Sequence, residues 1–366
     1  MTNRTQFSHS LNPMERLIAK AMGALRSRSL SEKLPLLEAD GVAVTHQMPP
    51  LSAAIMTANF GEIRRLLLRG EPTHGKRYSS HDDLQRPPLV VACGRIAGRN
   101  EALAMLLDAG APADFRHKPC AGIERGLLTL ALSQGAWECS NLLIERMADP
   151  LALDSDGRSP MIAAVQGITR DGAGWTEPSL FEDICRHLLS LGADINGSCL
   201  NEVGGPGPAL FMGDTPMLAT RGHPLAMQAL LGMGVDRHKA NARGFTPLMA
   251  AARGAIRHES LNALLGLLSH KDIQDSVPVV DENGLDALAH FCSGSKILTD
   301  PKASESAVRA CKQMLKAGAN PSTAIEVAAS MEHPWMPIIL AAREKNILSE
   351  SSPSSRAPII SGAKRL

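Results

Sequence analysis

The sequence predicts an all-α fold in which helix-turn-helix units stack into a solenoid. A segment that begins with Thr or Ser before Pro and continues into small apolar residues recurs along the chain, as in TPLMAAARG from Thr246. Self-similarity at a spacing of about 33 residues or more is typical of solenoids. The chain of 366 residues is also 44% hydrophobic but only 3% aromatic. That composition suits closely stacked helices better than a β-sandwich.

The recurrent segment predicts the start of the first helix in each unit. Thr or Ser supplies an N-cap oxygen, and Pro fits the first helical turn. The predicted starts are residues 50, 88, 127, 160, 216, 247, 287 and 324, so successive starts lie 31 to 56 residues apart. Four residues after the start, small side chains would let neighbouring helices approach closely. The residues at that position are Ala54, Ala92, Ala131, Ala164, Thr220, Ala251, Phe291 and Ala328.

A second helix is expected to follow in each unit and to end in a Leu-Leu-x-x-Gly pattern or a close variant. A glycine at that place fits the left-handed conformation that ends many helices. The glycines concerned are Gly70, Gly110, Gly192, Gly234 and Gly318. Most units are longer than 33 residues, which predicts inserted loops.

These three elements, Thr-Pro-Leu, Ala-Ala and Leu-Leu-x-x-Gly, resemble the ankyrin repeat. The resemblance covers roughly residues 48–346 and is clearest at 159–164, 188–194, 215–236 and 246–251. It implies an ankyrin-type helical solenoid of about seven to eight helix-turn-helix repeats with finger loops. It also implies a concave surface of fingers and inner helices that binds another protein.

Two departures from the family's pattern affect this expectation. The family's histidine after Thr-Pro-Leu is absent from every unit, and Met249 stands there in the clearest one. The turns should therefore be looser or held by packing. The last two units match weakly, as capping units often do.

The ends of the chain differ from the repeats. We expect residues 1–13 to be a flexible leader, 14–47 to form capping helices over the first repeat, and 347–366 to be a flexible tail. Alternatively, the acid-poor first thirty residues are a targeting signal, either for import into an organelle or for injection of a bacterial effector into a host cell. Seven scattered cysteines favour reduced thiols inside a cell. We expect a cytoplasmic protein, with delivery into a host cell left open.

Two inserted loops are candidate contact surfaces. Residues 167–180 lie between the helices of one unit and contain Trp175, either a contact anchor or a side chain packed on the convex helices. Residues 196–214 precede the next unit, and their run from Gly204 to Pro208 predicts an irregular displayed loop. Either loop is alternatively a tolerated insertion.

Basic residues near the predicted finger tips are candidate partner contacts. They fall in the segments 74–81, 115–119 and 236–244. If the fingers line up, these residues form a positive ridge that favours a partner protein with an acidic face. The candidate partner-binding residues are Lys76, Arg77, Tyr78, Phe115, Arg116, Lys118, Arg237, Lys239 and Arg243. Neighbouring aspartates dilute the ridge, and exposed loops commonly carry solvated charge.

Other classes of function receive little support. The net charge of +1 gives no general attraction to nucleic acid, and one tyrosine cannot make a base-stacking platform. No apolar run is long enough to span a bilayer. His117 and Cys120 lack a second pair at a zinc-site spacing.

We therefore expect no catalytic residue, no cofactor and no metal, and a monomer that binds another protein. Two alternatives remain open. One is an enzyme or partner-modifying effector that uses the 196–214 loop. The other is a stoichiometric inhibitor or immunity-type protein.

Overall fold

The computed structural model describes residues 49–74, 87–94, 98–118, 123–169, 178–201, 211–255, 258–294, 301–328 and 336–350. The chain divides into two compact units, Met1–Gly122 and Ile123–Leu366. In both units nearly all of the regular secondary structure of the described residues is helical. None of the helices in these ranges is long and apolar enough to cross a membrane.

The described part of the first unit contains two helix pairs. Its elements are α3 (Pro50–Met56), α4 (Phe60–Leu68), α5 (Pro88–Ala92), α6 (Arg99–Asp108) and the two-residue strand β1 (Arg116–His117). Within the pairs, α3 packs on α4 and α5 on α6, and between them α3 packs on α5 and α4 on α6. Ile63, Leu103 and Leu106 are completely buried where these helices meet.

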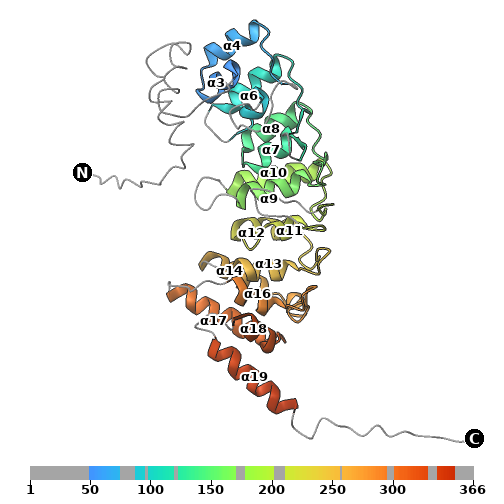
Figure 1. Ribbon diagram of the computed structural model, residues 1–366, viewed down its shortest axis with the longest axis vertical. Coiled ribbons are helices and arrows are strands. Elements are labelled where there is room, and N and C mark those ends of the chain that lie inside the picture. The colour runs from blue at the N-terminus through green and yellow to red at the C-terminus, as the bar shows by residue number, and fades with distance from the viewer. Residues whose placement is uncertain are drawn as a thin grey trace, which may run out of the picture. The chain divides into compact units, whose positions relative to one another are not determined.

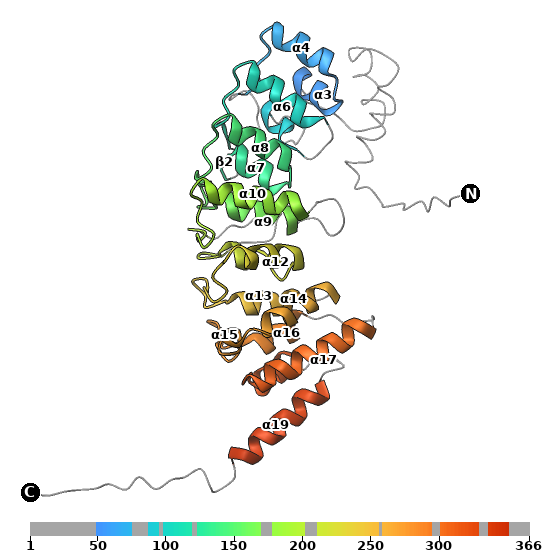
Figure 2. The ribbon, with the colours of Figure 1, turned by 180° about the vertical axis from the view of Figure 1, so that it is seen from behind.

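The second unit contains six helix pairs among its described residues. Its elements are β2 (Arg125–Gly126), α7 (Leu127–Ser133), α8 (Trp137–Glu145), α9 (Pro160–Thr169), α10 (Pro178–Ser190), α11 (Pro216–Ala219), α12 (Pro224–Gly232), α13 (Pro247–Gly254), α14 (His258–Leu268), α15 (Lys271–Gln274), α16 (Ala287–Gly294), α17 (Pro301–Lys316), α18 (Pro321–Ala328) and α19 (Met336–Glu350). The first helices α7, α9, α11, α13, α16 and α18 pack on one another in chain order. Figures 1 and 2 show this stack, with the loops that join the pairs along one side of it.

The predicted capping of the first helices is confirmed at the clearest units. The Thr215 hydroxyl accepts a hydrogen bond from the Leu218 N–H at 3.3 Å, and the Thr246 hydroxyl accepts one from the Met249 N–H at 3.2 Å. Met249, which replaces the family's histidine, is buried, and its sulfur accepts a hydrogen bond from the Thr246 N–H at 3.4 Å. This turn is therefore held by packing and capping, one of the two outcomes expected.

The last predicted start, residue 324, is wrong. Helix α18 begins at Pro321, after Asn320. The Asn320 side chain accepts a hydrogen bond from the Ser322 N–H at 2.9 Å, and the Asn320 N–H donates to the Asp286 carboxylate at 2.6 Å. Asn-Pro thus starts this helix three residues before the Thr-Ala-Ile segment that the repeat pattern suggested.

The small residues and the terminal glycines behave as predicted. All eight residues four positions after the predicted starts are buried, including Thr220 and Phe291. Gly70, Gly110, Gly192, Gly234 and Gly318 all have positive φ, between 76° and 97°. Each therefore adopts the left-handed conformation that ends its second helix.

Glycines at the end of three first helices set the distance between repeats, a role that the sequence analysis did not assign. They are Gly167 in α9, Gly254 in α13 and Gly294 in α16. A Cβ added at any of them would collide with a main-chain carbonyl oxygen of the preceding repeat, that of Leu132, Arg221 or Arg253 respectively. Only a hydrogen fits between these backbones.

Several sequence predictions concern residues outside the described ranges. These are the leader and capping helices at 1–47, Trp175, and the run from Gly204 to Pro208. Of the predicted 167–180 insertion, only residues 170–177 fall between α9 and α10, because α9 continues to Thr169 and α10 begins at Pro178. Helix α19 continues to Glu350, beyond the predicted boundary at 346. The short helix α15 and the two short strands were not predicted.

Candidate functional site: the finger turns of the second unit

The loops that join successive repeats of the second unit contain turns with a shared construction. We call residues 154–158, 199–201 with 211–214, 241–245, and 281–285 the finger turns. In the second of them, the ends of the inserted loop are joined because the Cys199 N–H donates to the Asp214 carbonyl and the Gly213 N–H donates to the Cys199 carbonyl, both at 2.8 Å. The two ends of the inserted loop are therefore hydrogen-bonded to each other.

The other three finger turns share one pattern of main-chain hydrogen bonds. The first residue of each turn, Asp154, Asn241 or Asp281, receives a hydrogen bond on its carbonyl from the glycine three positions later, at 2.8–3.1 Å. Its own N–H donates to the carbonyl of the residue four positions later, at 3.0–3.1 Å. The glycines have φ values of 76°, 71° and 73°, so the repeated Asp/Asn-x-x-Gly pattern has a conformational reason.

The second, third and fourth finger turns are bound to one another through their main chains. The Ala242 N–H donates to the Met212 carbonyl at 3.0 Å, and the Glu282 N–H donates to the Arg243 carbonyl at 2.9 Å. A Cβ added to Gly213 would lie 2.7 Å from the Ala242 nitrogen, and one added to Gly157 would collide with Leu200. The turns therefore form a continuous edge rather than separate flexible tips.

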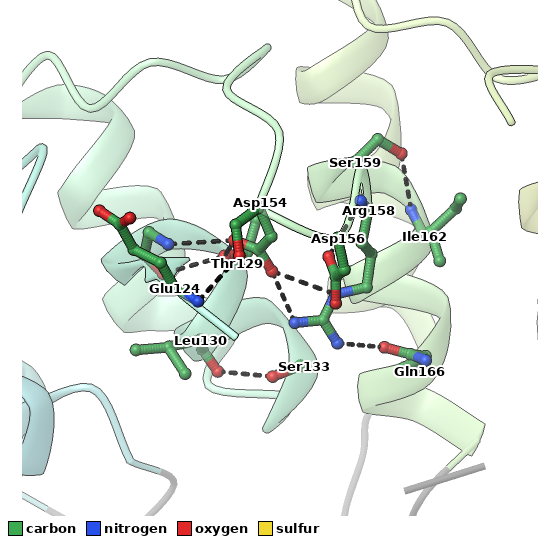
Figure 3. A network of polar contacts seen from close by, with 12 residues as sticks. Glu124, Thr129, Leu130, Ser133, Asp154, Asp156, Arg158, Ser159, Ile162 and Gln166 are labelled. Atoms are coloured by element: carbon green, nitrogen blue, oxygen red, sulfur yellow. Dashed lines mark hydrogen bonds and ion pairs between the residues drawn. The ribbon is translucent and has the colours of Figure 1, made fainter. Parts of the chain in front are cut away.

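A buried ion pair holds the first finger turn to two helices (Figure 3). The Arg158 guanidinium donates to the Asp154 carboxylate at 2.6 Å and to the Gln166 side chain of α9 at 2.6 Å. Asp154 also accepts hydrogen bonds from the Thr129 hydroxyl at 2.5 Å and the Gly126 N–H at 3.0 Å. One carboxylate thus joins the turn to the start of α7.

Buried polar groups support the later turns as well. The Asn241 amide donates to Asp214 at 2.8 Å, and the Phe211 N–H donates to the other oxygen of Asp214 at 2.9 Å. Burial raises the pKa of Asp214, although both hydrogen bonds oppose that shift. In the last turn, His290 Nε2 lies 2.9 Å from the Asp281 carboxylate, and its ring meets Phe245 edge to face at 4.9 Å between centroids.

The predicted basic residues of the second unit lie on or beside these turns and contact neighbouring loops. Arg237 lies 3.4 Å from the Asp272 carboxylate, and Lys239 donates to the Asn196 carbonyl at 2.8 Å. Arg243 lies 3.6 Å from Glu282, and its guanidinium stands 4.2 Å above the centre of the Phe211 ring. These positive charges thus have acceptors within the protein, while all three side chains stay at least partly exposed to solvent.

The predicted residues of the first unit divide into two groups. Arg116, in β1, and Lys118 are exposed, and Phe115 meets His74 edge to face at 5.5 Å. Lys76, Arg77 and Tyr78 lie outside the described residues.

Sequence reasoning missed a set of exposed apolar side chains on the same edge. We call them the apolar row: Leu200, Phe211, Met212, Val279 and Val280. Four of them are between 43% and 59% exposed, and the Phe211 ring is partly covered by Arg243. The available signal was the presence of apolar residues directly beside turn glycines and aspartates, where no helix core can receive them.

One polar trio resembles a catalytic arrangement. His238 Nδ1 lies 2.9 Å from the Ser276 hydroxyl, and Nε2 lies 3.1 Å from the Asp272 carboxylate. However, the main-chain N–H groups of Ser276 and Val277 donate to carbonyls of their own turn, so neither can stabilise an oxyanion. The trio therefore fits a structural link between two loops better than a nucleophile and its base.

The ends of the 196–214 loop offer a second candidate nucleophile, Cys199. This thiol is buried, and burial raises its pKa, which disfavours the reactive thiolate. Within the described ranges, no group of three or more His, Cys, Asp or Glu side chains could hold a metal ion.

Comparison with known proteins gives structural neighbours only. No family model and no curated protein matches the sequence. The ankyrin repeat domain of human ASB11 is similar in structure, with 19% identity and a TM-score of 0.47, over 74% of this chain and 98% of that one. The ankyrin repeat domain of Bcl-3, a unique member of the IkappaB protein family, is similar in structure with 19% identity and a TM-score of 0.42, over 65% of this chain and 92% of that one.

The fold assignment is carried by the chain's own architecture. Capped first helices, second helices that end in left-handed glycines, and finger turns recur in order through the second unit. By fold, the chain is an all-α repeat protein of the ankyrin type.

Proposed function

We propose that the protein is a protein-protein interaction module that binds its partner through the finger turns and the adjoining first helices. The observation that carries this proposal is the hydrogen-bonded edge of the second unit, where Met212 is joined to Ala242 and Arg243 to Glu282. A surface that is already ordered loses little conformational entropy on binding. Several side chains can then contact one partner at the same time.

The basic side chains of this surface support an acidic partner. Arg237 and Arg243 are paired with Asp272 and Glu282, both of which are about half exposed. Exposed ion pairs contribute only about 0–1 kcal/mol, so a partner carboxylate can replace an internal one at little cost. In the first unit, Arg116 and Lys118 are exposed and would contribute in the same way.

Affinity capture followed by charge reversal tests this proposal. After capture of the partner, the variant Arg116→Glu, Lys118→Glu, Arg237→Glu, Lys239→Glu is expected to bind it about tenfold or more weakly, mainly through slower association. The matched control reverses four exposed basic residues of second helices: Arg64, Arg186, Lys312 and Lys316. Equal affinity of the two variants for the captured partner would contradict the proposal.

Where the module acts remains a prediction from the sequence. We propose a cytoplasmic, monomeric protein. If it is a bacterial effector, it is delivered into the cytoplasm of a host cell. Affinity capture from the native cell, and from a host where there is one, would separate these settings. A tight complex of fixed stoichiometry would favour the inhibitor or immunity reading, and turnover of the partner would favour a modifying enzyme.

A further inference from the structure

We infer that Arg221 and Arg253 form a two-arginine site that binds a carboxylate group of the partner protein. We call these two residues the arginine pair. The inference rests on the proposed function and deepens it, because it names the side chains at the ends of two first helices that an acidic residue of the partner contacts.

The close stacking of two first helices brings the arginine pair together. Arg221 directly follows the C-cap of α11, and Arg253 lies in the last turn of α13, the next first helix. The Arg221 carbonyl lies against Gly254, the residue after Arg253. A Cβ added to Gly222 would lie only 3.0 Å from the Ala251 carbonyl oxygen of α13. The main chains that carry the two arginines are therefore in contact, and both arginines are exposed to solvent.

The positive charge of Arg253 has no internal acceptor in the part of the chain that the structure describes. Its guanidinium makes no hydrogen bond or ion pair there. It meets positive groups instead. Burial lowers the pKa of Arg221, and the charge of Arg253 lowers it further. The same charge adds to the lowering of the pKa of His290 by burial.

Asp214 offsets part of the charge of the arginine pair. Its carboxylate favours the charged form of Arg221 and so opposes the lowering of the pKa of that guanidinium. Both oxygens of Asp214 already accept hydrogen bonds from the second and third finger turns. The pair therefore keeps a positive charge that a ligand can balance.

The helix ends explain the two arginines only in part. A positive charge near the C-terminus of a helix interacts favourably with the helix dipole. This applies to Arg253 in the eight-residue α13, but α11 has only four residues and hence a small dipole. Arg221 has a φ of 48°, where glycine would fit without strain, so the turn does not require an arginine. Repulsion between the two charges also opposes folding, whereas a bound anion would relieve it.

A carboxylate suits the geometry and the charge of the arginine pair. The guanidinium group donates several N–H groups in one plane and commonly binds both oxygens of a carboxylate. Because Asp214 offsets part of the charge of the pair, a group with one negative charge balances the rest. A phosphoryl group on a side chain carries nearly two negative charges at neutral pH and would exceed that balance.

The arginine pair is separate from the basic residues of the finger turns. Arg243 stands before the start of α13, and Arg253 lies in its last turn. A helix of eight residues is about 12 Å long, so one carboxylate cannot contact both arginines at their places in the chain. The partner therefore needs a second acidic residue for the arginine pair, and the two contacts can be tested independently.

Selection of random peptides displayed on phage, with the full chain immobilised, tests the inference. Enriched peptides are expected to contain an Asp or Glu whose change to Asn or Gln weakens binding about tenfold. Arg253→Gln should weaken binding of the acidic peptide by a similar factor and leave binding of its amide counterpart almost unchanged, because the two changes remove the same contact. Arg221→Gln should act in the same way. Binding of the acidic peptide should weaken between about 0.05 and 0.5 M salt, because exposed charges are screened.

The matched control is Lys316→Gln, which removes an exposed positive charge from the last turn of α17. It should bind the acidic peptide as the native chain does, and circular dichroism should show native helical content in all three variants. Acidic peptides that depend on Arg237 and Lys239 but not on Arg253 would overturn the inference while supporting the proposed function.

Two further outcomes would contradict the inference. A phosphoserine peptide that binds about tenfold more tightly than the peptide with Asp or Glu at that position would overturn the carboxylate as the ligand. Failure to enrich acidic peptides would overturn the arginine pair as a site and count against the acidic partner of the proposed function.

Discussion

The Arg158 guanidinium and the Asp154 carboxylate form an ion pair at 2.6 Å, with side chains only 4% and 0% exposed. Breaking such a pair on one side costs about 3–5 kcal/mol, because a charge is left buried without its partner. We expect Arg158→Met to lower the free energy of unfolding by about this amount. Asp154 keeps its hydrogen bonds from Thr129 and Gly126, which favours the lower end of the range. Urea denaturation followed by circular dichroism measures the loss.

An exposed ion pair in the same unit supplies the control. Arg186 lies 3.1 Å from Glu182, but the two side chains are 61% and 38% exposed. Arg186→Met should change stability by less than about 1 kcal/mol. Equal losses in the two variants would show that the Asp154–Arg158 pair does not hold the first finger turn.

Gly254 is expected to tolerate no side chain, because it lies against the Arg221 carbonyl of the preceding repeat. Gly254→Ala forces α11 and α13 apart, and overpacking of this kind costs about 1–3 kcal/mol. Gly266, inside α14, has open space where a Cβ would be. There the same change should stabilise the protein by about 0.5–1 kcal/mol, because Ala is the better helix former. Thermal unfolding of the two variants should shift in opposite directions, and a shift of the same sign would refute the close approach.

The limits of prediction follow from the range of the interactions involved. Thr246 before Pro247, and Gly234 after a Leu-rich helix, are local signals, so the sequence correctly predicts helix starts and ends there. The contact of Gly254 with Arg221 joins two repeats, and nothing in the segment 243–254 indicates it. Asn320 starts α18 early partly because Asp286, 34 residues away, binds its N–H.

The candidate site has the same limit. The position of segment 236–244 between two predicted helices places Arg237, Lys239 and Arg243 on a finger. It does not show that Asp272 and Glu282 lie opposite the two arginines. Exposed apolar residues such as Met212 and Val280 look like core residues in a sequence. Their place beside turn glycines and aspartates is the one signal in the sequence, and the structure shows that they are exposed.

Cys311 is expected to be inert in the folded protein. Its side chain is completely buried, and burial raises the pKa of its thiol to about 12. At pH 8 only about one molecule in ten thousand would carry the reactive thiolate. Iodoacetamide should therefore modify Cys311 only after denaturation, as peptide mass spectrometry can show. Equal rates of modification in buffer and in urea would mean that α16 and α17 separate in the native state.

His290 should make the protein less stable in mild acid. Burial lowers the pKa of His290 below its usual value, although Asp281 at 2.9 Å opposes the shift. Because the unfolded chain takes up this proton at a higher pH than the folded chain, stability is full above about pH 6.5 and decreases as the pH falls through the lowered pKa. The contribution is at most about 1.4 kcal/mol for each pH unit. His290→Gln should remove this part of the pH dependence, whereas His270→Gln, which changes an exposed histidine, should leave it intact. Urea denaturation of the three proteins between about pH 5 and 8 measures the difference, and parallel pH profiles for all three would show that the buried imidazole is not responsible.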